Sequence, residues 1–341
     1  IPPKTNFWQY AQSLFGLPSP LPPDIGLAGK GLSGQMDAAS DHFVVHGIPL
    51  TEFTDAAPTV SAPYQPARIV VRNAATAAEV ARQEQVVAPV SSEMMCVNCH
   101  SQTGDASTKY PISPVAKVEL NILKIHDYLS EASYPAGHTG SLYARAVAGS
   151  PILCAECHST NALGAPGVAG LMSLSKAMHT RHDGLSDIVN APSPTDGCYN
   201  CHPGPTTRCL RDVMSQDAGM TCVDCHGSMT RVSQNPNPWL NEPRCDDCHR
   251  GTVKQDQALY RNSKGHGGVY CAGCHDSPHA IAPSRESIDG AKFVALQGSR
   301  DTLMRCTVCH LTQPSAGSFR HTYHRSTRLP LVPNRAVLDT P

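Results

Sequence analysis

Cysteine and histidine recur in this chain in one five-residue pattern, Cys-x-x-Cys-His, which occurs seven times. Fourteen of the 15 cysteines belong to it. In a helical turn, residues i and i+3 lie on one face, so the two thiols of a motif can bond to the same ligand. The cysteines of the pattern are Cys96, Cys99, Cys154, Cys157, Cys198, Cys201, Cys222, Cys225, Cys245, Cys248, Cys271, Cys274, Cys306 and Cys309. Its histidines are His100, His158, His202, His226, His249, His275 and His310.

This spacing is the attachment signature of c-type haem. The two thiols form thioethers with the porphyrin, and the following histidine supplies the proximal nitrogen to the iron. Paired cysteines could also form zinc ribbons, and a cysteine-rich exported chain could carry a disulfide framework. Zinc sites do not require a histidine directly after the second cysteine, and disulfide frameworks do not repeat one unit seven times. The sequence therefore predicts seven covalently bound c-type haems.

Ten histidines remain outside the motifs, enough for each iron to receive a second histidine. His179 and His182 lie three residues apart in a predicted helix, where they can serve two adjacent haems. His138 lies in a loop and is the weakest candidate. His42 is preferred over His46, and one of His321 and His324 suffices. The predicted distal ligands are His42, His126, His179, His182, His266, His279, His321 and His324.

Iron with histidine on both sides is closed to substrate and transfers electrons, so we predict no catalytic residue. Methionine is the rival sixth ligand, but the surplus of histidine makes this choice unnecessary. The remaining thiol, Cys209, belongs to no motif. Three roles stay open for it: a buried thiol, a disulfide between chains, or a thiolate ligand of haem.

The composition predicts a thin core of amino-acid side chains. The chain has 341 residues, of which 26 are glycine and 29 proline, while aromatic residues make up 5%. We expect the haems to fill the interior that side chains cannot. With 27 basic and 28 acidic residues, nothing indicates a nucleic-acid or membrane-surface patch. No run of apolar residues is long enough for a transmembrane helix.

Motif positions divide the chain into three predicted parts. Residues 1–95 form a haem-free, β-rich module with a helix over 5–16 and strands over 41–50, 67–72 and 84–90, while residues 74–83 could form a helix or a hairpin. Residues 96–310 form the heptahaem domain, and residues 311–341 form an extended tail. The predicted fold class is mostly irregular, with short α-helices around a stacked haem chain and a small β-rich N-terminal module.

Beyond the motifs, the segments HGGVYCAGCHDSPHAIAPSRE, LRDVMSQDAGMTCVDCHG and DHFVVHGIPLTEFTD resemble those of extracellular multihaem c-type cytochromes of respiring bacteria and archaea. The resemblance implies electron transfer to redox partner cytochromes or to extracellular acceptors. Some members of this group polymerise into filaments, in which one subunit lends a histidine to a haem of the next. A homopolymer with such ligation is therefore one expectation.

Two other functions remain open. A multihaem reductase for nitrite, hydroxylamine or a sulfur oxyanion would need one open haem, and a periplasmic electron shuttle would need none. The chain begins at Ile1 without a leader pattern, so we expect a mature protein whose targeting segment has been removed. Because c-type haem is attached outside the cytoplasmic membrane, we expect an exported protein at the cell surface or outside it, with the periplasm as the alternative.

Overall fold

The computed structural model describes residues 7–138, 140–185, 194–235, 242–251 and 253–315. They are low in regular structure and cluster into two compact units. The first unit comprises Ile1–Ala62, Ser91–Asp183 and Tyr199–Gly204, and the second comprises Pro63–Val90, Gly184–Cys198 and Pro205–Pro341. The units cut across the predicted boundary at residue 95, because residues 63–90 cluster with the C-terminal half and residues 1–62 do not.

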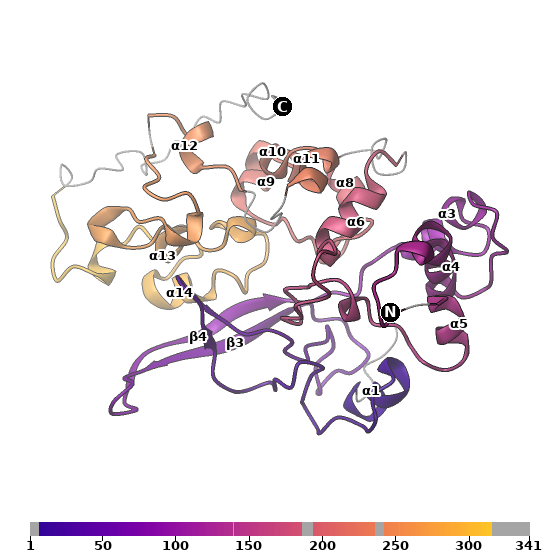
Figure 1. The fold of residues 1–341 in the computed structure, drawn as a ribbon. Coiled ribbons are helices and arrows are strands. Elements are labelled where there is room, and N and C mark those ends of the chain that lie inside the picture. The colour runs from indigo at the N-terminus through magenta and orange to yellow at the C-terminus, as the bar shows by residue number, and fades with distance from the viewer. Residues whose placement is uncertain (1–6, 139, 186–193, 236–241, 252, 316–341) are drawn as a thin grey trace. The chain divides into compact units, whose positions relative to one another are not determined.

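The first unit is built mainly from short helices (Figure 1). Its helices are α1 (Phe7–Phe15), α2 (Cys96–His100), α3 (Asp105–Thr108), α4 (Val118–Ser130), α5 (Leu142–Val147) and α6 (Leu174–His182), with the 3₁₀ turns η1 (Glu131–Ser133) and η2 (Cys154–Glu156). Its strands β1 (Asp37–Ala38) and β2 (Phe43–Val44) form one short antiparallel pair.

Two buried polar residues of α4 tie the first unit together. Asn121 is fully buried, and its amide donates to the carbonyl oxygens of His100 and Val115 at 2.9 and 2.8 Å. Asp127 accepts hydrogen bonds from the backbone N–H groups of Leu142 and Tyr143, the first two residues of α5, at 2.9 and 3.0 Å. Because a carboxylate at a helix N-terminus satisfies donors that have no partner within the helix, Asp127 fixes where α5 begins.

The second unit combines one β-hairpin with short helices. The hairpin consists of β3 (Tyr64–Arg72) and β4 (Glu79–Pro89). The helices are α8 (Pro194–Cys198), α9 (Val213–Ala218), α10 (Cys222–His226), α11 (Met229–Gln234), α12 (Cys245–Cys248), α13 (Cys271–His275) and α14 (Ala291–Gln297). The 3₁₀ turns are η4 (Tyr260–Asn262), η5 (His266–Gly268), η6 (Pro278–Ala280) and η7 (Cys306–Val308).

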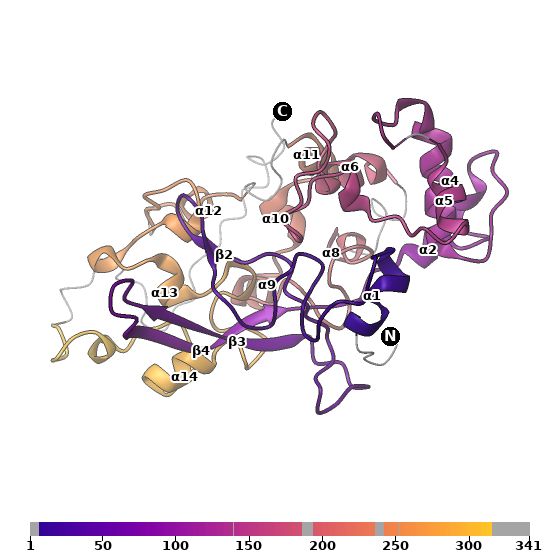
Figure 2. The same cartoon turned by 60° about the horizontal axis from the view of Figure 1, so that its bottom comes forward.

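The hairpin is the longest regular feature of the second unit, and α14 packs against β4 (Figure 2). Its antiparallel register runs from the pair Tyr64 and Pro89 to the pair Arg72 and Glu79, with two irregularities. At its turn, the Asn73 side chain accepts from the backbone N–H groups of Ala75 and Thr76 at 2.9 and 3.0 Å. Asparagine is common in such turns, because its side-chain oxygen can accept hydrogen bonds from backbone N–H groups two or three residues later.

Some predicted elements appear as expected and others do not. The predicted helix over 5–16 corresponds to α1, the predicted strand over 67–72 lies within β3, and the predicted strand over 84–90 overlaps the end of β4. Residues 74–83 form the turn and the start of β4, which settles the alternatives in favour of a hairpin. The predicted strand over 41–50 is reduced to the two residues of β2, because Gly47 adopts a positive φ and Pro49 cannot donate to a ladder.

Apolar side chains that are fully enclosed are few among the described residues. Those with the lowest exposure are Ala11, Phe53, Ile125, Leu142, Tyr199, Tyr260, Ala280, Ala282 and Phe293. A third of this set is alanine, which contributes little apolar area per residue. The thin side-chain core expected from the composition is therefore what the described residues show.

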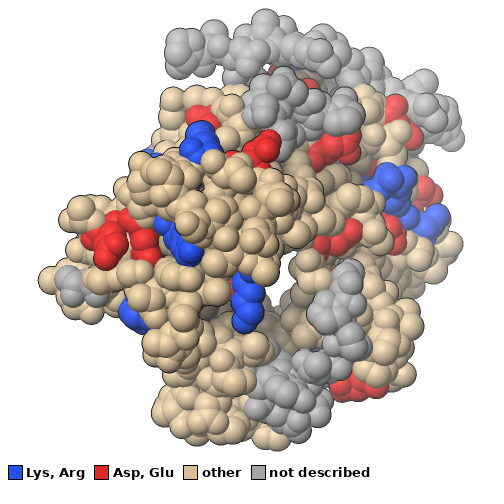
Figure 3. Space-filling view, turned by 90° about the vertical axis from the view of Figure 1, so that its right-hand side faces the viewer, with Lys and Arg blue, Asp and Glu red and all other residues tan. Residues whose placement is uncertain are grey.

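Charged side chains are interspersed on the face drawn in Figure 3, and neither sign gathers into a single patch there. The even balance of 27 basic and 28 acidic residues agrees with this distribution. Among the described helices, none combines the length and the apolar character that crossing a bilayer requires.

Candidate haem-binding centre

Within the described residues, five of the motif histidines each face a histidine from another segment. We call these the facing imidazole pairs. The distances between ring centroids are 6.4 Å for His100 and His182, 6.4 Å for His126 and His158, 6.0 Å for His179 and His202, 6.0 Å for His226 and His279, and 5.9 Å for His266 and His310. Every pair therefore joins one motif histidine to one predicted distal ligand.

The separation within these pairs matches two imidazoles on opposite sides of one metal ion. Metal–nitrogen bonds of about 2 Å on each side place the ring centroids roughly 6 Å apart. Aromatic rings in contact span about 4.5 to 7 Å, so distance alone does not separate the two cases. What favours a shared ligand is that every pair joins a motif histidine to a predicted distal histidine. The residues present thus fit the iron of a haem between each pair.

Hydrogen bonds to the Nδ1 atoms orient several of these rings. The Nδ1 atoms of His179 and His182 lie 2.7 Å from the carbonyl oxygens of Ser175 and Met178, one turn earlier on α6. The Nδ1 atom of His158 lies 2.8 Å from the carbonyl oxygen of Met172. A carbonyl oxygen only accepts, so each Nδ1 carries the proton and each Nε2 is left with its lone pair for a metal.

Burial keeps the enclosed imidazoles neutral. It lowers the pKa of His100, of His126 and of His249, and the facing ring of His182 or His158 adds to the effect at the first two. Neutral imidazole is the form that binds a metal ion. The environment of these rings therefore favours the ligand state at neutral pH.

Four motifs adopt the helical turn that the spacing predicts. They are α2, α10, α12 and α13, and η2 and η7 are 3₁₀ turns over the first residues of two further motifs. In both 3₁₀ motifs the histidine N–H still donates to the carbonyl of the first cysteine, at 2.9 Å for His158 and 2.8 Å for His310. The histidine therefore follows the two thiols in an α-turn whichever helix type precedes it.

Helix α6 positions two ligands at once. Its N-cap Ser173 accepts from the N–H of Lys176 at 3.3 Å, and the helix ends at His182. His179 and His182 are one turn apart and face different motif histidines, His202 and His100. A backbone hydrogen bond of 2.9 Å from Met95 to Asn200 also joins the two motifs concerned. The structure thus brings together the two adjacent sites predicted for this helix.

Loops rather than helices carry the facing histidines of the second unit. His266 begins η5, where Gly267 and Gly268 adopt positive φ values of 62° and 80° that favour glycine. Although it lies five residues before Cys271, His266 faces His310 of a later motif. His279 likewise follows the motif that ends at His275 but faces His226 of an earlier one.

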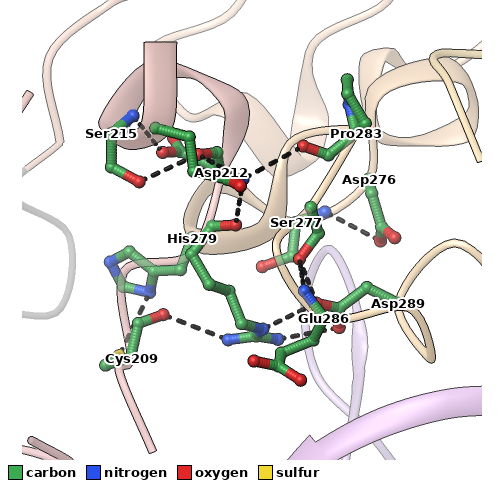
Figure 4. A network of polar contacts seen from close by, with 12 residues as sticks. Cys209, Asp212, Ser215, Asp276, Ser277, His279, Pro283, Glu286 and Asp289 are labelled. Carbon is green, nitrogen blue, oxygen red and sulfur yellow. Dashed lines mark hydrogen bonds and ion pairs between the residues drawn. The ribbon is translucent and has the colours of Figure 1, made fainter. Parts of the chain in front are cut away.

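Cys209 lies behind one of these ligands rather than against a motif histidine. Its Sγ atom is 3.8 Å from Nδ1 of His279 (Figure 4). Burial raises the pKa of this thiol, so it stays protonated at neutral pH. Cys209 is half-buried and contacts His279, and the three roles that the sequence left open stay predictions.

A buried ion pair holds the segment that carries His279. Arg211 is 4% exposed and donates to both carboxylate oxygens of Asp289, from Nε at 2.7 Å and from Nη2 at 2.9 Å. The N–H of Arg211 donates to the carbonyl of His279 at 2.9 Å, and its guanidinium lies 5.2 Å from the ring centre of Tyr64 on β3. Arg211 therefore links the hairpin to the loop of a predicted ligand.

Thiols of successive motifs are close enough to influence each other. Burial, and then the neighbouring Cys271, raise the pKa of Cys245 to about 11. In the same way burial raises the pKa of Cys225 to about 12, with Cys248 among the contributing charges, and Cys309 contributes at Cys274. The motifs of the second unit thus follow one another in space as they do in sequence.

The remaining predicted ligands have other surroundings or are not described. His42 lies against Asp41, with Nδ1 2.6 Å from the carboxylate, and the ring of His46 lies close to Gly164. His321 and His324 lie outside the described residues. The structure therefore brings His126, His179, His182, His266 and His279 together with motif histidines and does not do so for His42.

Sequence reasoning missed the residues that support the ligands. Tyr134, Asp127 and Arg211 belong to no motif, and no spacing rule marks them. In the sequence, these supporting roles could be suspected only from Asp127, which directly follows His126 in a predicted amphipathic helix.

The described residues hold no group of three or more histidine, cysteine, aspartate or glutamate side chains arranged for a bare metal ion. No disulfide links any of the described cysteines. Comparison with known protein families, with curated proteins and with solved structures gave no match to this chain.

Proposed function

We propose that the chain is an electron-transfer protein that binds seven c-type haems, each between two histidines. The observation that carries the proposal is the set of facing imidazole pairs, each of which joins a motif histidine to a histidine of another segment. When bound, c-type haem supplies one-electron chemistry at iron. Two axial histidines leave no open coordination position, which favours an electron carrier over a reductase.

Two observations support close spacing of the proposed sites. His179 and His182 are one turn apart on α6, so the two sites they serve share an element. In the second unit the thiols of successive motifs are neighbours, as in Cys245 and Cys271. Close spacing of redox centres is what a multisite electron carrier requires. We propose that the protein works in extracellular respiration and passes electrons to redox partner cytochromes or to extracellular acceptors. We also propose a homopolymer as one assembly of the chain.

Haem content and spin state test this proposal together. We expect the purified holoprotein to contain seven haems per chain and to show low-spin ferric signals alone in low-temperature EPR. The reason is that a second imidazole at each iron gives a strong, closed ligand field. Haem is quantified as the pyridine haemochrome against amino-acid analysis of the same sample.

Each outcome has a distinct meaning. Fewer than seven haems would contradict the assignment of the motifs. A stoichiometric high-spin signal would show one open iron and would move the function toward a reductase. Detection of the protein in a periplasmic extract and not at the cell surface would favour the shuttle.

A further inference from the structure

One facing pair differs from the others in what its distal ring contacts. The Nδ1 atom of His126 lies 2.8 Å from the hydroxyl of Tyr134, and that hydroxyl donates to Oδ1 of Asp127 at 2.7 Å. The rings of His126 and Tyr134 lie 5.5 Å apart with a tilt of 34°. The distal rings of His179 and His182 instead contact backbone carbonyl oxygens.

The direction of these hydrogen bonds follows from counting protons. A tyrosine hydroxyl has one hydrogen, and here Asp127 accepts it. Tyr134 can therefore only accept from His126, so Nδ1 of His126 carries the proton. The Nε2 atom then has its lone pair available, in a ring whose centroid lies 6.4 Å from that of His158.

Asp127 is held as a carboxylate. It is 9% exposed and also accepts from Ser141 Oγ at 2.7 Å and from two backbone N–H groups. With Tyr134, these donors give the side chain four hydrogen bonds, two to each oxygen, an environment that suits an ionised carboxylate, which only accepts. A hydroxyl that donates to an anion is a stronger acceptor, since hydrogen bonds in a chain polarise one another.

We propose that Tyr134, anchored by Asp127, is a positioning residue that makes His126 a stronger donor to iron and gives the His126–His158 site a lower reduction potential than the sites of His179 and His182. This inference rests on the proposed function. A more basic axial ligand stabilises ferric over ferrous iron, and partners of the second ring nitrogen set that basicity. The neutral carbonyl partners at His179 and His182, and the thiol at His279, polarise their rings less.

The test is a redox titration of the holoprotein carrying Tyr134→Phe, which removes the hydroxyl and keeps the ring. We expect one of seven one-electron components to become about tenfold easier to reduce, an upward shift of about 59 mV. One low-spin EPR signal should change with it. Placing the substitution in a His126→Ala background identifies the site, because the shift should vanish there.

Two controls separate polarisation from loss of structure. Tyr128→Phe changes an exposed tyrosine on α4, the helix that carries His126, and should leave every reduction potential unchanged. Ser141→Ala removes another hydrogen bond to the same carboxylate without touching His126. It should shift the reduction potential by only a small fraction of the shift that Tyr134→Phe causes. Equal shifts in Ser141→Ala and Tyr134→Phe, or no shift in Tyr134→Phe, would overturn the inference while seven haems remain. Absence of haem would instead overturn the proposed function.

Discussion

Replacing both His179 and His182 with alanine is expected to leave two of the seven irons high-spin in a chain that still carries all its haems. The two side chains face His202 and His100 at 6.0 and 6.4 Å. Removing them takes away one axial nitrogen from each site, whereas the thioethers and the motif histidines are untouched. Alanine has the highest helix propensity, so α6 should persist.

Three variants make this prediction quantitative. Each single substitution should produce one equivalent of high-spin iron, and the double variant should produce two, because the histidines face different motifs. His138→Ala is the matched control, since this loop histidine faces no motif histidine in the part of the chain that the structure describes. If the irons of the double variant stay low-spin, or if one substitution opens two sites, the assignment of these pairs is wrong.

The sequence was informative where chemistry depends on local spacing. Each of the seven motifs contains two cysteines and one histidine within five residues. Residues such as Cys222, Cys225 and His226 could therefore be predicted as one haem-binding set without tertiary structure. His179 and His182 could be predicted as a pair for the same reason, since residues three apart share a helix face. Strand-like segments between clusters of turn residues also indicated β3 and the second half of β4.

Pairing depends on tertiary structure and could not be read from the chain. His266 lies next to the motif that begins at Cys271, yet it faces His310, and His279 faces a histidine far earlier in sequence. His42 stays a prediction, because its Nδ1 contacts Asp41 and no motif histidine of the described residues is paired with its ring. The role of Tyr134 depends on a hydrogen bond that forms only once α4 and its following turn have folded.

The buried pair of Arg211 and Asp289 leads to the largest expected effect on stability. We expect Arg211→Met to lower the free energy of unfolding by about 3–5 kcal/mol, because it leaves the Asp289 carboxylate buried without a compensating charge. Ser284 Oγ, at 2.5 Å, would still donate to that carboxylate, but a hydroxyl carries no charge. The backbone N–H of Arg211, which donates to the carbonyl of His279, is kept in the variant, so the expected loss comes from the side chain alone.

Guanidinium unfolding of the holoprotein, followed by circular dichroism, measures this loss as a lower midpoint. Arg82→Met is the control, because Arg82 forms its ion pairs with Glu79 and Glu84 at the exposed surface of β4 and should matter little. The double variant Arg211→Met/Asp289→Asn should recover part of the stability, since it buries no unpaired charge and the new amide keeps an acceptor for Ser284. A midpoint for Arg211→Met equal to that of Arg82→Met would contradict a structural role for the pair. A loss that the double variant does not relieve would show that packing against Tyr64, rather than charge compensation, is what Arg211 supplies.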